Sequence, residues 1–142
     1  MTDHKSYKNE FLTICNNTVK RAESAYSTFS SPPSDFSKLV VHYYSFSCTL
    51  MNSVQETDSL MLKLSLGIQE KDMADRHQAV AALHSLFEHC AMLRKNIEDF
   101  LSSTELAKDD QNSFLSAFKL ETDKLIRKTL ILKNSANSMD LL

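Results

Sequence analysis

The side chains best suited to reactive or metal-binding chemistry in this chain are three cysteines, Cys15, Cys48 and Cys90. Each lies near the middle of a segment whose apolar spacing predicts a long helix. Because the middles of the helices share one layer in an antiparallel bundle, the three thiols could converge. One interpretation is a thiolate layer that binds a metal or another ligand. The other is three small core residues, because free cysteine is among the most buried residue types.

Metal-ligand spacing favours the packing interpretation. Structural zinc sites have four ligands, usually in closely spaced pairs, and the three cysteines are far apart in the sequence. His84 and Glu88 are four residues apart and could face one ion from the same side of a helix. Di-iron bundles, however, use a Glu-x-x-His pair on each of two helices, and residues 35–66 contain no such pair. We therefore expect no metal site and no other cofactor.

The chain also lacks a pattern typical of catalysis. Phosphate-binding loops and nucleophile elbows need glycine where φ is positive, and Gly67 is the single glycine of the chain. The carboxylate pair Asp109 and Asp110 falls in a predicted connection or helix start, where negative charge stabilises the helix end. We expect a protein that is not an enzyme.

The longest helical pattern covers residues 35–66. Its apolar face advances in alternating steps of four and three residues, the spacing of one side of a helix. The members of this face are Phe36, Val40, Tyr43, Ser47, Leu50, Val54, Thr57, Met61 and Leu64. A second row widens the apolar surface and consists of Val41, Tyr44, Cys48, Met51 and Leu62. Such a helix would be roughly 45–50 Å long, so it needs partners of similar length.

Similar spacing in the rest of the chain predicts three further helices. The expected ranges are 3–29, 35–66, 72–101 and 105–135, followed by a frayed tail at 136–142. Pro32 and Pro33 separate the first two, with Ser34 or Asp35 as the cap of the second. Short connections favour antiparallel neighbours, so we predict an all-α, up-down-up-down four-helix bundle in one domain spanning 1–142. The alternative is a helical hairpin-like monomer that completes its core by dimerising.

Composition narrows the classes of partner and location. The chain has 16 basic and 18 acidic residues, a net charge of −2, without the basic excess of a nucleic-acid-binding protein. It has no apolar run near the roughly 20 residues that span a bilayer, and no secretory signal at its start. An odd number of cysteines excludes a complete internal disulfide framework. We expect a cytoplasmic protein that does not bind nucleic acid or insert into membranes.

The aromatic cluster at residues 42–46 gives the main functional hypothesis. Its side chains span more than half of the helix circumference, so they cannot all face one core. We expect Tyr44, Phe46 and Met51 to contact a partner, which would make the chain a protein–protein interaction module: an adaptor, a regulator, or a small effector or chaperone. The partner would be another protein or a second copy of the chain. If the helix is instead covered on both sides, these residues belong to the core.

Two other functions stay open at this point. The first is a bundle that senses a ligand or metal through the central cysteine layer. The second is a peripheral protein that binds anionic lipid through the basic side chains of the last helix, which are Lys119, Lys124, Arg127, Lys128 and Lys133. Cations near a helix C-terminus also complement the helix dipole, and this simpler interpretation is the one we favour.

Overall fold

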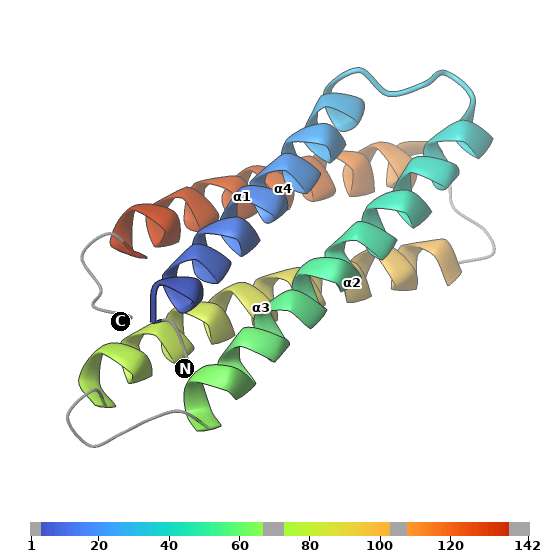
Figure 1. Ribbon diagram of the computed structural model, residues 1–142. Helices are drawn as coiled ribbons and strands as arrows, with labels where there is room; N and C mark the ends of the chain where they lie inside the picture. Colours follow the sequence, from blue (N-terminus) through green and yellow to red (C-terminus); the bar gives the residue numbers. More distant parts are fainter. Residues whose placement is uncertain (1–3, 67–72, 103–107, 137–142) are drawn as a thin grey trace.

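A computed structural model describes residues 4–66, 73–102 and 108–136 and shows four long helices (Figure 1). They are α1 (His4–Ser30), α2 (Phe36–Leu66), α3 (Met73–Ser102) and α4 (Lys108–Ala136). Consecutive helices run in opposite directions, and the described residues contain no strand. The predicted all-α, up-down-up-down four-helix bundle is confirmed.

The start of α2 follows the capping signal of the sequence. α1, α2 and α3 begin one residue later than expected, and α4 begins at Lys108. Asp35 caps α2, because its Oδ1 accepts a hydrogen bond from the backbone N–H of Ser37 at 3.0 Å and its carbonyl accepts one from Leu39 at 3.2 Å. Gly67 and the tail at 137–142 lie outside the described residues.

The bundle consists of two closely packed helix pairs. α1 packs closely against α4 and α2 against α3, whereas the contacts of α1 with α2 and of α3 with α4 are less extensive. Small buried residues such as Ala22 on α1 and Thr122 and Thr129 on α4 allow a close approach. The threonine hydroxyls donate to carbonyls of their own helix, to Phe118 at 2.6 Å and to Leu125 at 2.7 Å, so their burial leaves no unpaired donor.

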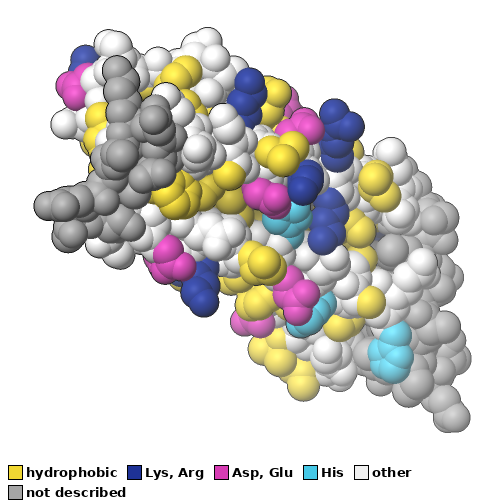
Figure 2. Space-filling view, turned by 180° about the vertical axis from the view of Figure 1, so that it is seen from behind, with side chains coloured by type: hydrophobic (Ala, Val, Ile, Leu, Met, Phe, Trp, Pro, Cys, Tyr) yellow, Lys and Arg dark blue, Asp and Glu magenta, His cyan; other side chains and the backbone are white. Residues whose placement is uncertain are grey.

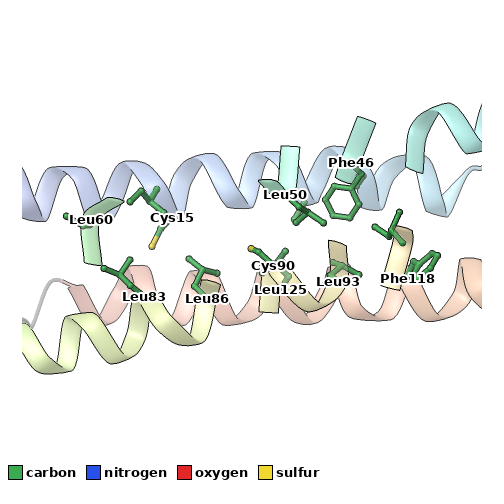
Figure 3. Close-up of a cluster of buried hydrophobic side chains, with 14 of the residues drawn as sticks. Cys15, Phe46, Leu50, Leu60, Leu83, Leu86, Cys90, Leu93, Phe118 and Leu125 are labelled. Atoms are coloured by element: carbon green, nitrogen blue, oxygen red, sulfur yellow. The ribbon is translucent and has the colours of Figure 1, made fainter. Parts of the chain in front are cut away.

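The core changes character along the bundle axis. In Figure 3, Leu60 and Leu83 lie towards one end and Phe46 and Phe118 towards the other. At the aromatic end Tyr43 is fully buried, and its ring centroid lies 5.1–5.4 Å from those of three phenylalanines: Phe29, Phe100 and Phe118. Burial raises the pKa of Tyr43 to about 12. One aromatic ring thus contacts rings from the three other helices.

The buried face of α2 is rotated from the expected one. Tyr43, Ser47, Leu50, Thr57 and Leu64 are buried as predicted. The remaining predicted positions are only partly buried or exposed: Phe36, Val40, Val54 and Met61. The core instead contains the residues one position before Val40, Val54 and Met61, which are Leu39, Ser53 and Leu60, and it also contains Phe46.

The expectation that Phe46 lies near the surface was therefore wrong. Its side chain is 4% exposed, and its ring meets that of Phe29 edge to face at 5.9 Å. The physical reason is the rotation of α2 towards α1, which places Phe46 over the α1·α2 contact. The alternative interpretation, in which Phe46 belongs to the core, is the one that the structure bears out.

Phe46 and Tyr44 form a matched pair for testing this rotation. We predict that Phe46→Ala lowers the free energy of unfolding by about 3–5 kcal/mol, because it removes a buried ring and leaves a cavity. Tyr44→Ala should cost less than about 1 kcal/mol, because Tyr44 is 56% exposed. Urea unfolding followed by circular dichroism measures both. If Phe46→Ala and Tyr44→Ala lower the free energy of unfolding equally, the described rotation of α2 is contradicted.

Candidate interaction surface

The side of α2 that faces away from the core carries an unpaired row of apolar residues. The row consists of Val41, Tyr44, Cys48 and Met51, here called the α2 outer row. Val41 is 65% and Tyr44 56% exposed, Cys48 is exposed, and Met51 is partly buried. The steps of three, four and three residues place all four on one stripe of the helix. This is the a/d spacing with which a second helix pairs in a coiled coil.

Polar residues bound the α2 outer row towards the end of the helix. The same spacing continues through Gln55 and Asp58, which are exposed, before Leu62, which is apolar and 60% exposed. The continuous apolar part therefore covers about 15 Å of helix, since each residue adds about 1.5 Å. Of the predicted partner residues, Tyr44 and Met51 lie on this row and Phe46 does not.

A polar network between α1 and α2 holds α2 in its rotation. Thr18 and Ser53 share a buried hydrogen bond of 2.8 Å, and Arg21 Nη1 donates to Ser53 Oγ at 2.9 Å. The same Nη1 forms an ion pair with Glu56, whose other oxygen accepts from Asn17 at 3.3 Å. Turning α2 so that Ser53 left the interface would break these contacts and leave Thr18 buried without its partner, which costs about 1–3 kcal/mol.

This network was not predicted from the sequence, but the sequence does contain a signal that Ser53 is buried. Leu39, Phe46, Ser53 and Leu60 recur every seven residues, which is the period of a bundle core. This set competes with the predicted one at the same spacing, and each set includes a serine. Counting apolar residues does not separate them, because the deciding contacts lie on α1.

The three cysteines do not converge on one layer. Cys15 and Cys90 are buried in the core, whereas Cys48 is exposed on the α2 outer row (Figure 3 labels the two buried cysteines). Burial raises the pKa of Cys15 to about 11 and that of Cys90 to about 12. Among the residues whose placement is described, no three histidine, cysteine or acidic side chains are grouped to hold a metal ion. Convergence of the three thiols, the less favoured of the two interpretations, is contradicted because Cys48 faces outwards, and the favoured packing interpretation holds for Cys15 and Cys90 but not for Cys48.

We predict that one of the three thiols reacts rapidly in the native protein. Thiolates are the reactive species, and burial keeps Cys15 and Cys90 protonated and shielded. With Ellman's reagent, the fast phase should correspond to one thiol and should vanish in Cys48→Ser. The other two should react only after urea unfolding. A second fast thiol in native Cys48→Ser would contradict the described burial.

The groove between α3 and α4 contains His89, a histidine whose pKa is lowered. It has a volume of about 500 Å³, and His89, Met92, Glu121 and Lys128 are among the residues that line it. His89 Nε2 lies 3.5 Å from Glu121 Oε2, and the side chain is 14% exposed. Figure 2 shows this side of the bundle, with histidine, acidic and basic side chains near its centre. Burial, assisted by the charge of Lys128, lowers the pKa of His89 against the opposing effect of Glu121.

His89 should make stability depend on mildly acidic pH. Its folded-state pKa is lower than its ordinary value of 6.5, so the unfolded chain binds the proton more readily. We therefore predict that the free energy of unfolding falls as the pH drops from about 7 to about 5. His89→Gln should reduce the dependence of the free energy of unfolding on pH. His84 is an exposed histidine of the same helix, and His84→Gln serves as the control that should retain this dependence. An unchanged slope in His89→Gln, measured by urea titration at each pH, would contradict the assignment.

The basic side chains of α4 are partly neutralised within the bundle. Lys124 pairs with Glu121 at 3.2 Å and Arg127 with Asp123 at 2.9 Å. Lys119 lies over the ring of Tyr26, 5.4 Å from its centroid. The exposed side of α4 nevertheless places apolar Leu120 and Ile131 on the same stripe as Lys124 and Arg127.

Comparison of the chain with protein-family models, with curated proteins and with solved structures finds no match. None of the described helices has the length and hydropathy needed to cross a membrane.

Proposed function

We propose that this protein is a non-enzymatic interaction module that binds a helix of a partner through the α2 outer row. The observation that carries the proposal is an apolar stripe with a/d spacing, exposed at Val41, Tyr44 and Cys48 and partly buried at Met51, on a helix whose opposite side packs in the core. Exposed apolar patches of this kind are typical of protein-binding surfaces. Tyrosine and methionine are among the residues enriched at interfaces, and both occur in the row.

Two features of the row define the partner we propose. The residues present an alternating seam, so the complementary element is an amphipathic helix with its own apolar stripe. The seam is only about 15 Å long, which corresponds to a small interface and a weak, reversible complex. The partner would be a helix of another protein or α2 of a second copy, the latter related by a twofold axis.

The contacts that fix α2 against α1 favour binding of a partner without rearrangement of α2. Thr18 and Arg21 of α1 hold α2 by a hydrogen bond to Ser53 and an ion pair with Glu56, and Lys63 of α2 pairs with Glu10 of α1 at 2.9 Å. A helix held at several points along its length loses little freedom on binding, so less of the interaction energy is lost to ordering. The free thiol on this surface fits a reducing compartment, and we propose that the protein acts in the cytoplasm.

A second candidate is a lipid surface that binds α4. It rests on the stripe formed by Leu120, Lys124, Arg127 and Ile131, which combines apolar and basic side chains as interfacial helices do. The cysteine-layer sensor is not proposed, because Cys48 lies on the surface.

Two substitutions at equally exposed β-branched residues separate these functions. Val41 on α2 and Ile131 on α4 are both 65% exposed, so aspartate at either position should leave the fold intact. We predict that Val41→Asp abolishes self-association measured by sedimentation velocity, or the recovery of a protein partner in pull-downs analysed by mass spectrometry. Ile131→Asp should retain the same association. Thermal unfolding verifies that both variants are folded.

The opposite pattern would refute the proposal. If Ile131→Asp removes the association and Val41→Asp does not, α4 is the interaction surface. Co-sedimentation with anionic vesicles that weakens as salt is added, with no binding to neutral vesicles, would then establish the lipid function. Catalytic turnover that both variants retain would show that the protein is an enzyme.

A further inference from the structure

A groove of about 300 Å³ lies between the second half of α1 and the first half of α2. Lys20 and Arg21 line it towards the middle of the bundle, and His42 lines it towards the connection at 31–35. Phe29 and Phe46, both nearly fully buried, form part of its floor. None of the described residues that line the groove is an aspartate or a glutamate. Its charged side chains are therefore all basic.

The arginine of this groove is already held in place. Arg21 Nη1 donates to Ser53 and pairs with Glu56, and the Arg21 side chain is 20% exposed. These contacts use one nitrogen of the guanidinium group, and Nε and Nη2 carry three further N–H donors. A fixed guanidinium with donors remaining is suited to binding a carboxylate or a phosphate.

The hydroxyl groups of the groove complement these cations. Thr28 donates to the carbonyl of Ser24 at 3.3 Å and Thr49 to that of Phe46 at 2.8 Å, so these two hydroxyls are engaged as donors. Ser24 and Ser45 are exposed and line the same groove, where their hydroxyls can donate to a ligand. The donors gathered around the apolar floor thus favour an acceptor-rich ligand.

The charge of the groove is local to this part of the α1·α2 contact. Beyond Arg21 a second hollow of about 410 Å³ includes Glu10 and Glu56, where basic and acidic charges are mixed. The hollow with Lys20 and without an acidic residue is therefore better suited to an anion than the one that contains the two glutamates.

We propose that the groove lined by Lys20, Arg21 and His42 binds a small organic anion with an aromatic body. Its carboxylate or phosphate group accepts hydrogen bonds from Arg21 and Lys20, and its ring lies against the floor near Phe46. A volume of about 300 Å³ is at the lower end of small-molecule sites. The site lies on the α1 side of α2 and shares no residue with the α2 outer row.

Chemical-shift titrations with four small probes test this assignment. Benzoate and phenyl phosphate carry the anions, benzamide is a neutral control and benzamidinium is a cationic control. We expect either or both anions to shift the backbone amide signals of Ser24, Ala25, Ser45 and Phe46, with weaker binding as salt is added. The anion that binds with the higher affinity shows whether the groove prefers a carboxylate or a phosphate. Benzamidinium should leave these signals in place.

Variants at exposed positions link the binding to the groove. Lys20→Gln should weaken anion binding by about two- to fivefold, which is the range of a solvent-exposed ion pair. Lys38 is an exposed lysine outside the groove, so Lys38→Gln should leave anion binding unchanged. Ser45→Trp should fill the groove and abolish binding in a folded protein, since Ser45 is exposed. The proposal is overturned if neither anion shifts these amides, if benzamidinium shifts them equally, or if Lys38→Gln weakens binding as much as Lys20→Gln.

Discussion

The hydrogen bonds between α1 and α2 determine which side of α2 meets solvent. Thr18 and Arg21 of α1 both form hydrogen bonds with Ser53 in the buried seam of α2, and Arg21 also forms an ion pair with Glu56. A buried hydroxyl without a partner costs free energy comparable to a small core cavity, so the network permits few alternatives. With Ser53 facing α1, Phe46 enters the core and Cys48 leaves it. Both the surface available for binding and the separation of the thiols follow from this one contact.

The pairing of the helices explains why the molecule has grooves where it does. α1 with α4 and α2 with α3 approach closely because alanine and threonine occupy part of each buried face. The two pairs meet less closely, through aromatic rings at one end and polar side chains in the middle. Hollows therefore form along α1·α2 and along α3·α4.

The reactive groups of the chain are dispersed by the same arrangement. Cys15 and Cys90 have raised pKa values because they are enclosed by apolar side chains, and such thiols are poor nucleophiles. His89 and Glu121 meet in the α3·α4 groove, which contains acidic and basic side chains, whereas the charged side chains of the groove between α1 and α2 are basic. The bundle thus separates a neutral apolar surface, a histidine–glutamate contact and a cationic hollow on different sides of one core.

The sequence by itself determined the helices and the bundle. One glycine, paired prolines at 32–33 and long heptad patterns leave few alternatives to four helices, and Asp35 specifies the start of α2 through its own side chain. These are local properties, set by backbone geometry and by side chains within a turn of each other. On α3 the apolar residues Leu86, Cys90, Leu93, Ile97 and Phe100 follow one another in steps of four and three residues, and all five are buried.

Only the tertiary structure decided the rotation of α2 and, with it, the candidate surfaces. Two heptad seams share Tyr43, Leu50, Thr57 and Leu64 and differ in whether Ser53 or Val54 accompanies them. Their apolar content is similar, so hydrophobicity alone cannot choose. The choice depends on Thr18 and Arg21, which are more than thirty residues from Ser53 along the chain and meet it only when α1 and α2 pack. Directional hydrogen bonds between distant segments therefore settled what local periodicity left open.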